Sequence, residues 1–168
     1  QPEQTLVCRM KKRGLVFWLT GLSGAGKTTL VEKVCERLNG QGLKTKILDG
    51  DDVRSRLHRH LGFSEEEIKE NNALIVGLCK IEREQTDVVL VSIISPYAQS
   101  RAKARERLSP DFFEIHVHAE IQVLEARDTK GLYAKARRGK MDNLIGYSSG
   151  YIYEQPASPD LVLDTGTM

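Results

Sequence analysis

Runs of apolar residues rich in β-branched side chains recur five times along the chain. They occupy Leu15–Thr20, Leu43–Leu48, Val88–Ile94, Phe112–Val117 and Leu161–Leu163. Runs that are apolar throughout, rather than alternating with polar residues, are typical of strands buried on both faces of a sheet. We therefore expect five strands in the interior of the protein.

The segments between these runs carry apolar residues three and four positions apart, as amphipathic helices do. One series comprises Leu30, Val31, Val34, Cys35 and Leu38, and another comprises Ile68, Leu74, Ile75, Leu78 and Ile81. Ser64 to Glu67 reads SEEE, the form of a capping box, which predicts a helix from there to about Glu84. Strands that alternate with helices predict an α/β fold, with a parallel sheet covered by helices on both faces.

Several polar residues stand at or just after the ends of predicted strands, among them Gly21, Asp49 and Ser95. Ligands of open parallel sheets bind outside the carboxyl ends of the strands, so we expect a binding site there. The long stretch 128–159 has no clear periodicity and contains the basic run KGLYAKARRGK. A long loop inside a compact domain is usually functional.

Composition narrows the class of protein. The 168 residues, 40% of them hydrophobic, fit a single domain spanning residues 1–168 with its own core. With 25 Lys and Arg against 23 Asp and Glu, the formal charge of +2 predicts neither a nucleic-acid nor a membrane partner. The chain has neither a long apolar run nor a signal-peptide pattern, and these features favour a cytoplasmic protein.

Cys8, Cys35 and Cys79 form no close-spaced pair, so we interpret all three as structural thiols in a reducing compartment. The chain begins with Gln1 and stops at Met168, soon after a strand-like run. This leaves open that it is an excerpt of a longer chain, with a C-terminal helix missing.

The sequence GLSGAGKT, Gly21–Thr28, matches the phosphate-binding loop pattern G-x-x-x-x-G-K-[ST]. It follows a predicted strand and precedes a predicted helix, and this context supports the match. Inward-facing backbone N–H groups and the helix N-terminus would hold the phosphates of ATP, and Lys27 would reach the β and γ phosphates. The expected ATP-binding residues here are Gly21, Leu22, Ser23, Gly24, Ala25, Gly26, Lys27, Thr28 and Thr29.

The second strand leads into LDGDDVR, Leu48–Arg54, opposite the phosphate loop. Asp49 and the Thr28 hydroxyl are candidate ligands of Mg²⁺ or of its bound water. Asp51 is the preferred candidate for accepting the proton of a substrate hydroxyl, and Asp49 is the alternative. Arg54 would offer a planar donor fork to an oxyanion.

At these residues the sequence resembles the adenylylsulfate kinase family of P-loop nucleotide kinases. The resemblance covers nearly the whole chain, through WLTGLSGAGKTT, LDGDDVR, LGFSEEE, the Asn71 region, ISPY, EARDTKGLYAKAR and LVLDT. It implies a phosphotransferase of the P-loop fold that uses MgATP to phosphorylate the 3′-hydroxyl of adenosine 5′-phosphosulfate (APS) in sulfate assimilation. It also implies either a homodimer or a domain fused to, or associated with, ATP sulfurylase.

The resemblance also assigns roles to individual residues. Lys27, Asp49 and Asp51 would be catalytic, and Arg127 and Lys130 would join the ATP site. Lys130–Arg137 would form a basic lid that closes over the nucleotides. The APS site would comprise Asp51, Arg54, Phe63, Asn71, Ile94, Ser95, Lys130, Gly131, Leu132 and Leu144, with Phe63 stacked on the adenine.

Five positions depart from the family's usual pattern. Ile68, Ala73, Leu74 and Ala98 stand where the family carries Arg, and Leu144 stands where it carries an aromatic residue that faces Phe63 across the adenine. An arginine bound to an anion contributes about 1.5–3 kcal/mol. Either other groups compensate, namely Arg56, Arg59, Lys69, Tyr147 or Tyr151, or the acceptor is a different nucleotide diphosphate analogue. A third hypothesis is a weakly active nucleotide-sensing domain attached to ATP sulfurylase.

Overall fold

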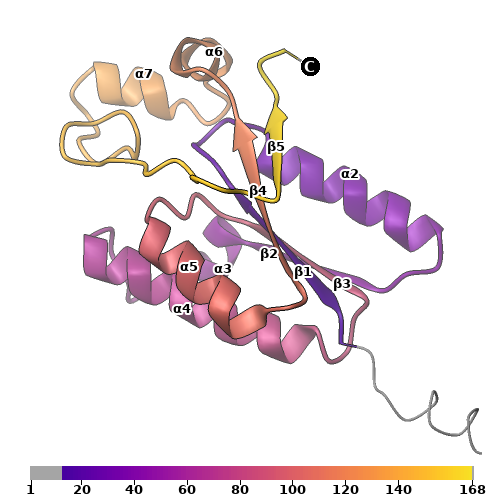
Figure 1. Cartoon of the computed structure of the whole chain (residues 1–168). Coiled ribbons are helices and arrows are strands. Elements are labelled where there is room, and N and C mark those ends of the chain that lie inside the picture. The colour runs from indigo at the N-terminus through magenta and orange to yellow at the C-terminus, as the bar shows by residue number, and fades with distance from the viewer. Residues whose placement is uncertain (1–12, 168) are drawn as a thin grey trace, which may run out of the picture.

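The computed structural model describes residues 13–167, and these contain one sheet of five parallel strands in the order β2-β3-β1-β4-β5 (Figure 1). The strands are β1 (Leu15–Thr20), β2 (Thr45–Asp49), β3 (Val88–Ser92), β4 (Phe112–His118) and β5 (Leu161–Asp164). All five expected strands are present. β2 starts later than expected because Leu43 lies in the loop before the strand, and β3 ends earlier because the chain turns at Ser95, whose φ is 48°.

Helices cover both faces of this sheet, as the sequence pattern predicts. They are α2 (Lys27–Gly40), α3 (Gly50–Arg56), α4 (Glu65–Glu82), α5 (Ala98–Leu108), α6 (Ile121–Arg127) and α7 (Leu132–Arg137). Figure 1 shows α2 on one face, α4 and α5 on the other, and α6 and α7 beyond the carboxyl ends of the strands. Among the described residues, no helix is long and apolar enough to cross a membrane.

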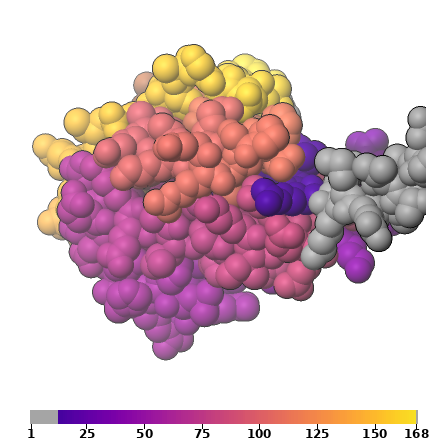
Figure 2. Space-filling model, turned by 60° about the horizontal axis from the view of Figure 1, so that its bottom comes forward, coloured from indigo at the N-terminus to yellow at the C-terminus, as the bar shows by residue number. Residues whose placement is uncertain are grey.

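The core is divided into two apolar layers by the sheet. Trp18, Ile75 and Leu108 belong to the layer under α4 and α5, whereas Val31 and Val117 belong to the layer under α2. In Figure 2 the salmon atoms of α5 lie between the magenta atoms of the preceding helical region and the yellow C-terminal segment. On this face α5 therefore lies between α4 and the C-terminal segment that leads to β5.

The start of α4 agrees with the capping-box prediction, with one difference. Ser64 is the N-cap, and its hydroxyl accepts the Glu67 N–H at 3.2 Å. The Glu67 carboxylate reaches back past Ser64 to the Gly62 N–H, at 2.5 Å. Glu67 therefore fixes the turn before the helix as well as the first turn itself.

The stretch 128–159 is not wholly irregular, because α7 forms within it. The carboxylate of Asp128 accepts the N–H groups of Tyr133 and Ala134 at 2.9 and 3.0 Å, and so satisfies donors of the first turn. Tyr133 is buried, and its hydroxyl donates to the Ser23 carbonyl at 2.6 Å. Helix α7 is thus attached to the loop between β1 and α2. Of the three cysteines, Cys35 and Cys79 are free thiols, and Cys8 lies outside the described residues.

The two faces of α4 predict unequal effects of isoleucine truncation. Ile75 is fully buried under the sheet, and Ile81 on the same helix is 59% exposed. Ile75→Ala should lower the free energy of unfolding by about 2–5 kcal/mol, since it leaves a cavity in the core. The matched control Ile81→Ala should change it by less than about 1 kcal/mol. Urea unfolding of both variants tests the packing, and equal losses would contradict it.

Candidate functional site

The loop between β1 and α2 has the tight backbone that anion binding requires. A side chain at Gly21 would place its Cβ only 2.2 Å from the Val117 carbonyl oxygen, so only glycine fits against β4. Gly26 caps α2 with φ 99°, a conformation that other residues rarely adopt. The helix N-terminus and the loop amides thus meet at one point, as in phosphate sites of this type.

Lys27 lies across this loop. Its ammonium donates to the carbonyls of Gly21 and Leu22, at 2.8 and 3.0 Å. The pKa of Lys27 is lowered to about 8, mainly by burial and also by nearby Lys130, while Asp51 and Asp49 oppose the shift. A bound phosphate would stabilise the charged ammonium and raise this pKa again.

Three oxygen groups face one another beside Lys27. The Thr28 hydroxyl donates to Asp49 Oδ2 at 3.0 Å and lies 3.5 Å from the Ser92 hydroxyl oxygen. Asp49 Oδ1 accepts the N–H groups of Asp51 and Asp52, so Asp49 is also the N-cap of α3. These are hard oxygen donors of the kind that Mg²⁺ prefers.

Asp51, in the first turn of α3, forms an ion pair with Lys130 at the start of the basic segment. Both side chains are more than half exposed, so the direct contribution of the pair to stability is small. The pair joins the start of α3 to the segment that precedes α7.

These groups line a cleft of about 470 Å³. The lining includes the predicted residues Ser23, Gly24, Gly26, Lys27, Thr28, Thr29, Asp49, Asp51, Arg54, Phe63, Asn71, Ile94, Ser95, Lys130, Leu132 and Leu144. It also includes residues not predicted as site residues, namely Gly50, Ile68, Asn72, Ser92, Ile93, Pro96, Thr129, Met141, Asn143 and Ile145. Most of these are neighbours of predicted residues along the chain, and Asn143 and Ile145 flank Leu144.

The remaining predicted residues do not line the cleft. Gly21 and Ala25 form the underside of the phosphate loop, and Leu22 faces a second cavity. Arg127 donates to the carbonyls of Gly24 and Thr165 and to the Thr165 hydroxyl, and so ties α6 to the loop and to the end of β5. Gly131 is the N-cap of α7, with φ 70°.

At the far end of the cleft, Arg54 holds the turn that carries Phe63. Its guanidinium donates to the carbonyls of Leu61 and Gly62, at 3.2 and 2.5 Å, and lies over the Phe63 ring at 4.5 Å from the centroid. Phe63 is nevertheless 51% exposed. One ring face is covered by Arg54, and the rest of the ring remains available to a ligand.

Two neighbouring asparagines of α4 are fixed differently. Asn71 accepts a hydrogen bond from buried His58 when the imidazole proton is on Nδ1, with Nδ1 and Oδ1 2.7 Å apart. Asn71 then keeps its amide NH₂ free to donate into the cleft. Asn72 donates to the Ile68 carbonyl and accepts the Ser95 hydroxyl at 2.7 Å. Asn72 therefore connects α4 to the end of β3.

The positions that depart from the family pattern divide into two groups. Ile68 and Leu144 line the cleft. Outside it and exposed are Ala73 and Leu74 on α4 and Ala98 at the start of α5. The basic residues considered as replacements are engaged elsewhere: Arg56 with Asp52, Arg59 with the Ser55 carbonyl, and Lys69 with Glu65. Among the described residues, the cationic side chains that line the cleft are those of Lys27, Arg54 and Lys130.

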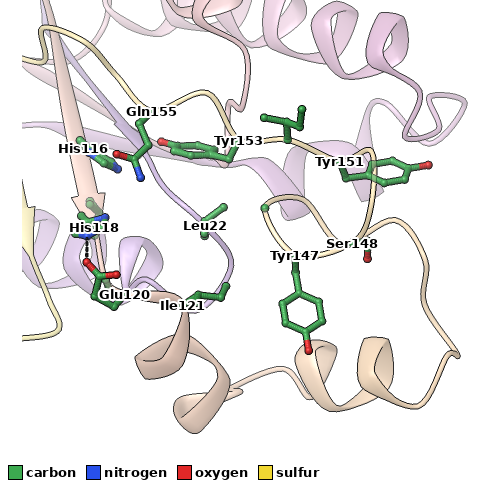
Figure 3. A pocket seen from close by; sticks show the side chains of 14 residues that line it. Leu22, His116, His118, Glu120, Ile121, Tyr147, Ser148, Tyr151, Tyr153 and Gln155 are labelled. Carbon is green, nitrogen blue, oxygen red and sulfur yellow. Dashed lines mark hydrogen bonds and ion pairs between the residues drawn. The ribbon is translucent and has the colours of Figure 1, made fainter.

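Tyr147 and Tyr151 line a second cavity, of about 420 Å³, rather than this cleft (Figure 3). That cavity lies between the end of β4 and the chain beyond α7, and Leu22 of the phosphate loop lines it. His118 pairs with Glu120 at 3.2 Å, and Tyr147 packs edge-on against Tyr133. Neither tyrosine therefore replaces the aromatic residue missing at Leu144.

Comparison with known proteins gives consistent results. The sequence model of the family described as adenylylsulphate kinase matches residues 13–164. The chain is 42% identical, over 92% of its length, to 87% of a probable adenylyl-sulfate kinase of Pyrococcus abyssi. It is 45% identical, over 92% of its length, to 82% of an adenylyl-sulfate kinase of Halothermothrix orenii.

Solved structures agree with these matches. The protein is similar, with a TM-score of 0.86 and 39% identity, to the APS kinase of Mycobacterium tuberculosis in complex with AMPPNP and APS. The superposition covers 91% of this chain and 89% of that one. The family match spans the phosphate loop, the end of β2 and the basic segment, which are the parts that build the cleft. The chain belongs to the adenylylsulfate kinase family.

Proposed function

We propose that the protein transfers the γ-phosphoryl group of ATP to the 3′-hydroxyl of APS, giving ADP and 3′-phosphoadenylylsulfate. The observation that carries this proposal is the single cleft that joins a phosphate loop at one end to the exposed Phe63 ring at the other. In the transfer, the bond from the γ phosphorus to the bridging oxygen breaks and a bond to the ribose oxygen forms. The hydroxyl proton passes to a protein carboxylate.

The donor half of the cleft suits the β and γ phosphates. Loop amides and the N-terminus of α2 would bind phosphate oxygens of ATP. Lys27 would exchange its two carbonyl partners for oxygens of the γ-phosphoryl group that is transferred. Catalysis by such a site comes mainly from positioning and charge neutralisation. The carbonyls of Gly21 and Leu22 hold the ammonium close to that position.

Thr28 and Asp49 fit a magnesium ion. Their oxygens lie 3.0 Å apart at the mouth of the loop, and Mg²⁺ in such sites takes few protein ligands and completes its shell with phosphate and water. When bound, the ion would neutralise charge on the β and γ oxygens. Among residues 13–167, no group of three or more His, Cys, Asp and Glu side chains could enclose a metal ion. Binding through Thr28, Asp49 and the phosphates does not need such a group.

The acceptor half of the cleft presents a ring, an amide and a guanidinium. Phe63 would stack on the adenine, and the Asn71 amide would donate to the nucleotide. Arg54 lies against Phe63 and would place its charge near the phosphosulfate. Ile68 and Leu144 add apolar wall where the family carries an arginine and an aromatic residue.

That apolar wall favours one alternative, a kinase of the same chemistry that acts on a different nucleotide diphosphate analogue. A transfer assay with radiolabelled ATP and a panel of nucleotides separates the two functions. Labelled 3′-phosphoadenylylsulfate as the dominant product supports APS. Efficient labelling of another nucleotide, with none of APS, would overturn the proposal.

Lys27 tests whether the protein is a kinase or only a nucleotide sensor. Lys27→Ala should lower kcat by about 10²-fold or more, because it removes a preorganised charge from the transition state. The matched control Lys33→Ala, on the exposed face of the same helix, should keep the wild-type rate. Wild-type protein without turnover but with a nucleotide response that Lys27→Ala abolishes would instead indicate a sensor.

Asp51 is the expected proton acceptor. Asp51→Asn should lower kcat by about 10²- to 10⁴-fold, the usual contribution of a general base. Asp52→Asn is the control, since Asp52 is adjacent in α3 and its carboxylate pairs with Arg56, both side chains being more than half exposed. Steady-state rates at saturating ATP and acceptor decide the question. Nearly full turnover by Asp51→Asn would exclude Asp51 and leave Asp49.

Phe63 is expected to contribute to acceptor binding alone. Phe63→Ala should raise the KM for APS about tenfold, which corresponds to the loss of one stacking face, and leave the KM for ATP unchanged. Leu57→Ala is a suitable control because Leu57 is 59% exposed in the preceding turn and lies outside the cleft. An equal rise in both KM values would contradict a role specific to the acceptor.

A further inference from the structure

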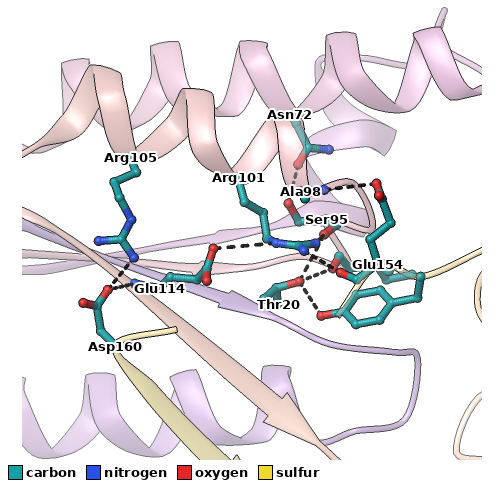
Figure 4. Close-up of polar contacts among 11 residues, drawn as sticks. Thr20, Asn72, Ser95, Ala98, Arg101, Arg105, Glu114, Glu154 and Asp160 are labelled. Carbon is teal, nitrogen blue, oxygen red and sulfur yellow. Dashed lines mark hydrogen bonds and ion pairs between the residues drawn. The ribbon is translucent and has the colours of Figure 1, made fainter. Parts of the chain in front are cut away.

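A buried polar junction lies behind the acceptor wall, and Arg101 of α5 is at its centre (Figure 4). The Arg101 side chain is 2% exposed. Its guanidinium donates to the Ser95 carbonyl at 2.5 Å and to the Glu154 carbonyl, and its Nε lies 3.6 Å from the Glu114 carboxylate. One side chain thus bonds two segments that are far apart in sequence.

Ser95 is the first of these segments and is held in an unfavourable conformation. Its φ of 48° lies in the left-handed region, which costs a non-glycine residue on the order of 1–3 kcal/mol. The Ser95 carbonyl accepts from Arg101 and from the Thr20 hydroxyl, at 2.5 and 3.2 Å, and its own hydroxyl donates to Asn72. These bonds hold Ser95 and Asn72 in the wall of the cleft.

Glu154 belongs to the second segment, residues 138–160, which we call the return segment because it leads from α7 back to β5. Its N–H donates to the Pro96 carbonyl at 2.8 Å, and its carboxylate accepts the Ala98 N–H at the start of α5. Its carbonyl accepts from Arg101. The neighbouring Tyr153 hydroxyl lies 2.8 Å from that of Thr20, the last residue before the phosphate loop.

The geometry requires an arginine at this position. Two carbonyls and a carboxylate surround one buried cation, and the planar fork of a guanidinium can address all three at once. A lysine would keep the charge opposite Glu114 but has a single nitrogen. Burial raises the pKa of Glu114, and nearby Arg101 and Arg105 oppose that shift. The Arg101 cation therefore offsets part of the cost of burying the Glu114 carboxylate.

We propose that Arg101 is a positioning residue. It holds Ser95, in the wall of the acceptor half of the cleft, in a fixed position relative to Glu154 of the return segment. The guanidinium fixes Ser95 in its left-handed conformation, and the same group fixes Glu154 below the part of the chain that covers the cleft. Loss of this link should affect the acceptor half and leave the donor half intact. For its effect on APS, this inference rests on the proposed function.

Kinetics of Arg101→Met and Arg101→Lys provide the first test. Arg101→Met should raise the KM for APS at least tenfold and change the KM for ATP less than threefold, and Arg101→Lys should recover part of the loss. Arg107→Met is the matched control, because Arg107 lies on the exposed side of the same helix. Proportional changes in both KM values, or no change in either, would overturn the proposal. If Arg101→Met does not fold, the KM values of Arg101→Lys for APS and ATP decide the question alone.

Limited trypsin digestion with AMPPNP provides a second test that needs no turnover. Cleavage at Arg138 and Lys140, the trypsin sites within the return segment, should be about tenfold faster in Arg101→Met than in wild type or Arg107→Met, since the segment loses its attachment at Glu154. Each arginine variant removes one trypsin site from α5, so the two are comparable. Equal cleavage rates would overturn the link, whereas wild-type protein that leaves APS unphosphorylated would overturn the proposed function alone.

Discussion

The close approach of Gly21 to the Val117 carbonyl is the contact on which the nucleotide site depends. With 2.2 Å between that oxygen and a Cβ at this position, no other residue allows β1 to run beside β4 and then curl into the phosphate loop. Parallel pairing brings the ends of β1, β2 and β3 to the same edge of the sheet. Lys27, Asp49 and Ser95 therefore face one cleft although they are far apart in sequence.

Charge in that cleft is nearly balanced, and the balance explains several contacts. Lys27, Arg54 and Lys130 contribute three cations to the lining, and Asp49 and Asp51 contribute two carboxylates. Each cation has protein oxygens as partners: loop carbonyls, turn carbonyls or Asp51. Anionic nucleotides would replace these oxygens one by one. The protein thus keeps its cations in place through bonds that a ligand can exchange.

Sequence patterns predicted the features that depend on local rules. The five strands, the capping box at Ser64 and the grouping of the phosphate loop with Asp49 and Asp51 follow from periodicity and from the geometry of parallel sheets. Helix α7 was missed because its first turn is capped by Asp128 from outside the helix, which no capping pattern describes. The junction around Arg101 was missed because its partners come together only in the folded chain.

The ion pair between Asp51 and Lys130 has a consequence for fidelity. A kinase that holds ATP must keep the γ-phosphoryl group from water until the proper acceptor arrives. A water molecule that enters this cleft meets an Asp51 carboxylate that is already engaged by Lys130. An acceptor that draws Lys130 to its own phosphate would free that carboxylate at the moment its hydroxyl is in place, and the same contact would then discourage hydrolysis until the substrate arrives.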